Sequence, residues 1–141
     1  MKKTLVMLLL LTMILLLAAC GGGDLNTLAI SNIQRSEDTI AADITFDGSY
    51  ENVSVAFHSD VDNDAFTGTA DYTCELGAVE AGQAYPVEAT TGGGWTYSGE
   101  FRMVSISNGQ FNIEPPDLAG ETIVITVLDG DTELISAESK P

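Results

Sequence analysis

The chain has 141 residues, of which 21 are acidic and 5 are Lys or Arg, and its formal net charge at pH 7 is −16. A surface this negative repels the phosphate backbones of nucleic acids, so we expect no nucleic acid partner. The 2 cysteines and 1 histidine are too few for a disulfide framework or for a zinc site of several Cys and His ligands.

The N-terminus has the pattern of an export signal. Lys2 and Lys3 precede an apolar run of 13 residues from Leu5 to Leu17. This run is shorter than the roughly 20 apolar residues that a transmembrane helix needs. Residues 1–19 are therefore predicted to be a cleaved signal peptide.

The end of this signal, Leu17-Ala18-Ala19-Cys20, resembles the lipobox of bacterial lipoproteins. The resemblance implies that Cys20 becomes the first mature residue and carries a lipid. The lipid would attach the protein to a membrane of the bacterial cell envelope, at the outer membrane or the cell surface. An uncleaved anchor helix with an incidental cysteine is the alternative.

Residues 20–26 are then the lipidated cysteine and a Gly-rich tether, and residues 27–141 form a single domain. Cleavage leaves 3 basic and 21 acidic residues, so the mature charge is about −18. Attachment must then come from the lipid, since no basic face is available to bind headgroups.

The mature chain reads as an all-β domain, an antiparallel β-sandwich of about 7–9 strands. Apolar residues alternate with polar or small ones in two early segments: Ile40, Ala42, Ile44 and Phe46 in the first, and Val53, Val55 and Phe57 in the second. A period of two places one face of each strand in a core.

Turn residues at short spacing predict three hairpins. Residues 28–34 and 39–46 flank a polar turn, Asn108 and Gly109 separate two β-rich runs, and Asp129 to Asp131 separate two more. The proline-containing segment 115–120 is predicted to hold a single helical turn, because proline cannot donate to a central ladder.

An acidic stretch, HSDVDNDAFTGTADY, covers residues 58–72. Asp60, Asp62 and Asp64 occupy positions 1, 3 and 5 of a twelve-residue loop, and Asp71 occupies position 12. This spacing, with the repulsion among clustered carboxylates, predicts a calcium site formed by these four residues. Position 6 is Ala65 where an EF-hand needs glycine, and both flanks read as strands, so the loop is not an EF-hand. A metal-free acidic turn is the alternative.

The same stretch resembles a motif of exported bacterial and archaeal β-sandwich domains. In that motif D-x-D-x-D is followed by Thr-Gly, here Thr67 and Gly68, and then by Ala-Asp-Tyr, here residues 70–72. The resemblance extends loosely to Trp95 with Gly99 and to residues 114–120. It implies that the acidic loop binds calcium and that the domain accompanies surface or carbohydrate-related proteins.

Three aromatic residues, Trp95, Tyr97 and Phe101, share one parity in the segment WTYSGEF. They are candidates for a platform on which a sugar ring stacks, and core packing is the alternative.

The sequence thus predicts a lipid-anchored, non-catalytic envelope protein with a calcium-stabilised sandwich that binds a carbohydrate or a protein partner. No catalytic set is evident, because His58 is the only histidine. Two alternatives stay open: a small envelope hydrolase that uses paired carboxylates, and a purely structural subunit of an envelope assembly.

Overall fold

The computed structural model describes residues 24–36, 39–90, 93–102, 105–107, 109–112 and 118–141. The signal peptide, Cys20, Asn108 and residues 115–117 of the proline-containing segment lie outside these ranges, so the structure does not address signal cleavage, lipidation or a helical turn at the two prolines. Within the described ranges no helix is long and apolar enough to cross a membrane.

All regular structure in the described ranges is β. The strands are β1 (Ala29–Arg35), β2 (Thr39–Thr45), β3 (Tyr50–Asp62), β4 (Phe66–Val79), β5 (Tyr85–Thr90), β6 (Thr96–Phe101), β7 (Ser105–Ser107), β8 (Gln110–Asn112), β9 (Ile123–Asp129) and β10 (Thr132–Ser139).

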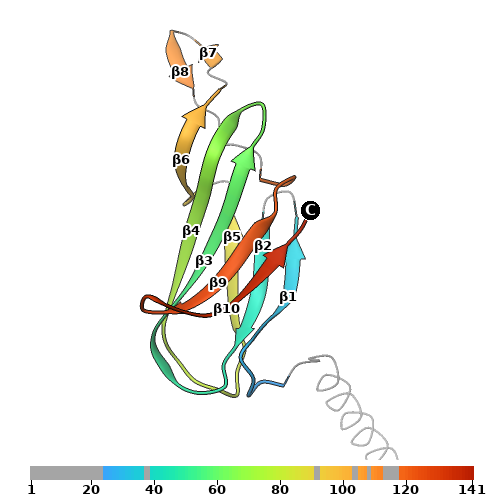
Figure 1. The fold of residues 1–141 in the computed structure, drawn as a ribbon, viewed down its shortest axis with the longest axis vertical. Coiled ribbons are helices and arrows are strands. Elements are labelled where there is room, and N and C mark those ends of the chain that lie inside the picture. The colour runs from blue at the N-terminus through green and yellow to red at the C-terminus, as the bar shows by residue number, and fades with distance from the viewer. Residues whose placement is uncertain (1–23, 37–38, 91–92, 103–104, 108, 113–117) are drawn as a thin grey trace, which may run out of the picture.

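The strands form two main antiparallel sheets that lie face to face (Figure 1). A three-stranded sheet has the order β1-β2-β5, and a five-stranded sheet has the order β10-β9-β3-β4-β6. Strands β7 and β8 pair only with each other in the described part of the chain. The prediction of an antiparallel β-sandwich of about 7–9 strands is confirmed.

The core lies between the two sheets and is formed by alternate residues of their strands. The predicted inward residues of β2 and β3 are all buried, and β9 contributes Ile123, Ile125 and Val127. Burying each such aliphatic or aromatic side chain contributes about 1.5–3 kcal/mol, and this gain holds the two sheets together.

The three predicted hairpins are also present. Strands β1 and β2, β7 and β8, and β9 and β10 are antiparallel neighbours. Gly109 and Gly130 have φ angles of 77° and 57° at two of these turns, a conformation that glycine adopts without steric cost.

The longest hairpin joins β3 and β4, which have 13 and 14 residues. Its turn lies at the opposite end of the sandwich from the end at which β1 begins (Figure 1). The acidic turn, residues 63–65, therefore lies far from the start of β1.

Candidate functional site

The acidic stretch folds as the end of the β3–β4 hairpin. Asp60 and Asp62 belong to β3, where they pair with Thr69 and Thr67 of β4, and Asp71 pairs with His58. Only residues 63–65 lie outside the two strands. The twelve-residue loop expected for calcium is thus mostly ladder, joined by a short turn.

Asn63 closes this turn with its own side chain. Its Oδ1 atom accepts hydrogen bonds from the backbone N–H groups of Ala65 and Phe66, both at 3.0 Å. Its backbone N–H donates to the carbonyl of Phe66 at 3.0 Å. These bonds satisfy the backbone of the turn without a metal, as asparagine side chains commonly do.

Arg102, at the end of β6, supplies a positive charge at the same turn. Its guanidinium lies 3.1 Å from Asp62 Oδ1 and donates to the carbonyl of Asn63 at 3.1 Å. Its backbone N–H donates to the carbonyl of Ala65 at 2.8 Å. Arg102 therefore ties β6 to the turn and partly neutralises Asp62, a role that no local sequence pattern indicated.

His58 lies between two of the remaining carboxylates. Its Nδ1 atom is 2.6 Å from Asp71 Oδ1, and its Nε2 atom is 3.4 Å from Asp60 Oδ1. The hydrogen bond to Asp71 raises the pKa of His58, and burial opposes this shift. Thr69 donates to the second oxygen of Asp71 at 3.3 Å.

The four predicted calcium ligands are divided among different partners. Asp62 is bonded to Arg102 and Thr67, whereas Asp60 and Asp71 flank His58. Asp64 is exposed in the turn between the strands. Alternate residues of a strand are roughly 7 Å apart along the chain, so Asp60 and Asp62 would have to lean toward each other to share one ion. In the structure Asp62 instead contacts Arg102, and Asp60 contacts His58.

Nowhere in the described ranges do three or more His, Cys, Asp or Glu side chains converge as metal ligands. The arrangement of these residues does not fit a calcium ion, and we derive no chemistry through one. Calcium binding by these four residues would require the turn to rearrange, and an experiment with calcium tests this directly.

Trp95 faces the core. Only 9 % of its surface is exposed, and its Nε1 atom donates to the carbonyl of Thr90 at 2.8 Å. Its ring packs on Tyr72 with a centroid separation of 5.6 Å. Trp95 therefore offers no open face on which a sugar could stack.

Tyr97 and Phe101 are half-buried and pack around Phe66, which is fully buried. The ring centroid of Phe66 lies 5.9 Å from that of Tyr97 and 4.7 Å from that of Phe101. The predicted platform residues thus pack on the same side as the core, which is the alternative reading of this aromatic stripe.

Two glycines make this aromatic packing possible. Gly68 and Gly99 are paired across β4 and β6, and their Cα atoms approach each other closely. A Cβ atom on Gly68 would lie 2.2 Å from the carbonyl oxygen of Ser98. Glycine at both positions lets the strands meet there, and the ring of Phe66 lies over the exposed backbone.

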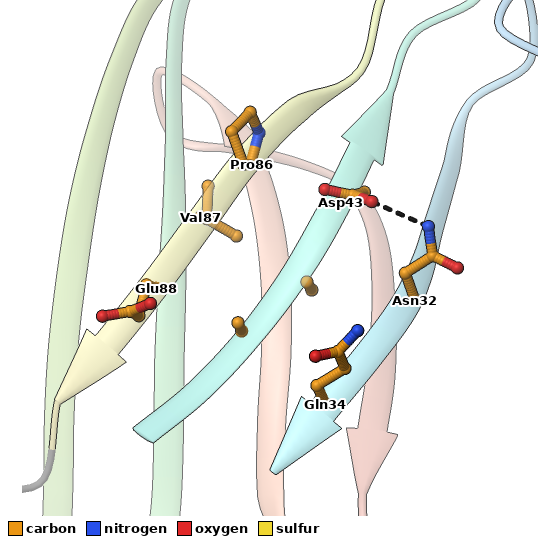
Figure 2. A pocket seen from close by; sticks show the side chains of 8 residues that line it. Asn32, Gln34, Asp43, Pro86, Val87 and Glu88 are labelled. Carbon is orange, nitrogen blue, oxygen red and sulfur yellow. Dashed lines mark hydrogen bonds between the residues drawn. The ribbon is translucent and has the colours of Figure 1, made fainter. Parts of the chain in front are cut away.

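A hollow of about 300 Å³ lies on the outer face of the three-stranded sheet. Figure 2 shows Asn32 and Gln34 on β1, Asp43 on β2, and Pro86 and Glu88 on β5 around it. Sequence reasoning missed this site, because its residues come from strands whose pairing the sequence did not reveal.

The pairing of the strands explains the shape of the hollow. Ala41, on the central strand, is paired with Gln34 on one side and with Glu88 on the other. A small side chain between two long ones leaves a depression with an apolar floor. The Nδ2 atom of Asn32 donates to Asp43 Oδ2 at 2.7 Å and holds that carboxylate at the rim.

Asn32 has a φ angle of 49° and lies where the β1–β2 register shifts between Ser31 and Gln34. Asparagine tolerates this left-handed conformation better than most residues. The resulting bulge turns the Asn32 amide toward Asp43 and adds a donor to the hollow.

Comparison of the chain with protein-family models, with curated proteins and with solved structures found no match. The functional interpretation therefore depends on the residues and geometry of this chain.

Proposed function

We propose that the protein is a lipid-anchored, non-catalytic protein of the bacterial cell envelope whose β-sandwich binds a carbohydrate or a protein partner, with carbohydrate favoured. The observation that carries the preference is the hollow on the outer face of the three-stranded sheet. It combines amide and carboxylate groups with a small apolar floor. Sugar recognition needs this combination, because hydroxyl groups require hydrogen-bond partners while the ring presents C–H surface.

The anchoring part of the proposal rests on the lipobox-like sequence that ends at Cys20. Cys20 is four positions before Asp24, and four residues span at most about 14 Å. A lipid on Cys20 would keep that end of the domain close to the membrane. The hollow lies on the side of the sandwich and would stay open to ligands.

Anchoring is tested by expressing the full chain and a Cys20→Ala variant in a bacterium. We expect the unaltered chain to sediment with membranes and to show the mass of an acylated product that begins at residue 20. The variant should lose the acyl mass. An unaltered chain that keeps residues 1–19 would contradict the proposal and support an uncleaved anchor helix.

Ligand binding is tested by screening the detergent-solubilised full chain on a glycan array. Saturable binding to a defined group of glycans supports the proposal. An array without binding, together with a stoichiometric envelope protein recovered after crosslinking in cells, would indicate a structural subunit instead.

The hydrolase alternative has one observation in its favour, because Asp43 and Glu88 line the same hollow. Glycosidases place two carboxyl groups on opposite sides of the bond that they cleave. Incubating the protein with each bound glycan and analysing the products distinguishes the two functions. We expect the glycans to be recovered intact.

A further inference from the structure

We propose that the hollow on the outer face of β1, β2 and β5 is the carbohydrate site and that it selects an amino sugar with a free, protonated amine. This inference rests on the proposed function and specifies its ligand. It is carried by the shape of the hollow, by its two carboxylates, and by the positions of the basic side chains elsewhere.

The size of the hollow limits the ligand to a small group. About 300 Å³ is at the lower end of the roughly 300–1,000 Å³ typical of small-molecule pockets. Ala41 forms the floor and Pro86 one wall, and both give apolar contact to the C–H face of a sugar ring. One ring can occupy this space, while neighbouring rings of an oligosaccharide would extend along the open sheet.

The polar groups of the hollow carry negative charge. Asp43 is half-buried on the central strand, and Glu88 is exposed on β5 beside it. One oxygen of Asp43 accepts the Asn32 amide, which orients the carboxylate and leaves its other oxygen for a ligand. Gln34 adds a side-chain amide that can donate a hydrogen bond to a sugar hydroxyl group or accept one from it.

The basic side chains of the described residues are engaged away from the hollow. Arg35 donates to the carbonyls of Leu118 and Ser139, Arg102 pairs with Asp62, and Lys140 pairs with Glu138. The lining of the hollow contains no Lys or Arg. A ligand that brings its own positive charge would therefore meet the negative charge of Asp43 and Glu88 without competition from a basic side chain of the lining.

Other sugars fit this lining less well. A uronic or sialic acid would add a third negative charge to the two already present, and like charges at an interface oppose binding. A neutral or N-acetylated sugar can form hydrogen bonds with the amides and the carboxylates, but it brings no positive charge to attract the two carboxylates. The geometry points to an ammonium group at the free oxygen of Asp43, with the ring on Ala41 and Pro86 and with Glu88 adding negative charge at the opposite edge of the hollow.

The test uses the detergent-solubilised full chain and chitosan oligosaccharides, which carry free amines. Chitin oligosaccharides of the same length, which are N-acetylated, and cellulose oligosaccharides, which are neutral, are the comparison ligands. At about pH 6 and low salt, where carboxylates are ionised and the amine is protonated, we expect chitosan to bind at least about tenfold more tightly than either. Raising the salt to about 0.5 M should remove most of this preference, because exposed charges are screened.

Two sets of variants locate the binding. Asp43→Asn combined with Glu88→Gln should weaken chitosan binding at least about tenfold. The matched control, Glu75→Gln with Glu133→Gln, removes two exposed carboxylates from the other sheet and should bind as the unaltered chain does. Ala41→Leu fills the floor without changing charge and should abolish binding of every sugar that the hollow accepts.

Each outcome decides between the inference and the function on which it rests. Equal affinity for chitosan and chitin, or full binding by the Asp43/Glu88 double variant, would overturn the amino-sugar inference while carbohydrate binding stands. Binding that Ala41→Leu leaves unchanged would move the site away from the hollow. An array without any bound glycan would overturn the proposed function itself.

Discussion

His58 of β3 lies directly opposite Asp71 of β4, with its Nδ1 atom 2.6 Å from the Asp71 carboxylate. The same imidazole has its Nε2 atom 3.4 Å from Asp60. A protonated ring can donate to both carboxylates, whereas a neutral ring can donate to only one. The hydrogen bond to Asp71 is the main cause of the raised pKa of His58, with smaller contributions from Asp60.

We predict that this contact stabilises the domain in mildly acidic solution. A histidine whose pKa is higher in the folded than in the unfolded chain contributes its full stability below about pH 6.5, the unfolded value. The contribution is lost as the pH rises through the higher folded pKa. The His58 side chain is 40 % exposed, so solvent screening limits the gain to about 0.5 kcal/mol.

Because His58 is the only histidine, its NMR signals report this titration without ambiguity. We expect its pKa to lie above 6.5 and to fall in Asp71→Asn. In denaturation experiments the stability difference between the unaltered chain and His58→Gln should be larger at about pH 5.5 than at about pH 9. A His58 pKa below the usual value would contradict the prediction.

The second prediction concerns the cation at the β3–β4 turn. Arg102→Gln removes the ion pair with Asp62 and weakens the hydrogen bond to the carbonyl of Asn63. Both charged side chains are more than half exposed, so we expect a loss of about 0.5–1 kcal/mol in the free energy of unfolding.

Arg102→Lys is the matched control for charge. It keeps the attraction to Asp62 but not the fork that reaches two acceptors, so its stability should lie between those of the unaltered chain and Arg102→Gln. Equal stability of all three proteins at low salt would show that the ion pair contributes nothing.

The third prediction concerns the paired glycines. Gly99→Ala would place a Cβ atom 2.1 Å from the carbonyl oxygen of Thr67, and that oxygen belongs to the backbone of the neighbouring strand. The strands must separate to relieve this contact, which also disturbs the packing of Phe66 and Phe101. We expect a loss of about 3 kcal/mol or more, measured by chemical denaturation.

Gly48→Ala is the control, because a Cβ atom at Gly48 has no neighbour within 4 Å. Its effect should stay within about 0.5–1 kcal/mol. If Gly99→Ala were as mild as Gly48→Ala, the close approach of β4 and β6 would not be a property of the protein in solution.

The fold was largely predictable, because each strand leaves its own mark on the sequence. A strand with one buried face must alternate apolar and polar residues, and Ile40 to Phe46 does so. Gly109 and Gly130 mark two of the hairpins, because their turns need a positive φ angle. These signals are local, so one sequence is enough to see them.

The candidate site was not predictable, because its residues meet through pairing between distant strands. Arg102 reaches Asn63 across 39 positions, and Ala41 meets Glu88 through the ladder between β2 and β5, which are not consecutive in the chain. Spacing alone suggested that Asp60 and Asp62 converge. In the structure both residues belong to the extended strand β3, and the neighbouring residues on β4 determine which groups each carboxylate contacts.

The fourth prediction separates the core role of Trp95 from a ligand platform. Trp95 is the only tryptophan, and its indole is buried with its N–H bonded to Thr90. Its fluorescence should therefore be weakly quenched by acrylamide and unchanged when a bound glycan is added. Trp95→Phe should lower the free energy of unfolding by about 1–3 kcal/mol, because the Thr90 carbonyl loses its partner. A change in Trp95 fluorescence on addition of the glycan would indicate that this ring belongs to the binding site.

The last prediction tests calcium directly. An ion bound only by the folded chain stabilises it by about 2.7 kcal/mol at a hundredfold excess over Kd, a shift of several degrees in Tm for a domain of this size. Asp62 already has Arg102 as its cation, and the ladder keeps Asp60 and Asp71 beside His58. We therefore expect the Tm in about 5 mM calcium to differ by less than about 2 °C from the Tm in the presence of a chelator. Magnesium should have the same effect as calcium, because any remaining change comes from general screening of the acidic surface. A rise of about 5 °C or more with calcium alone, removed by Asp64→Ala, would mean that the turn rearranges around the ion and that Asp62 exchanges the guanidinium for it.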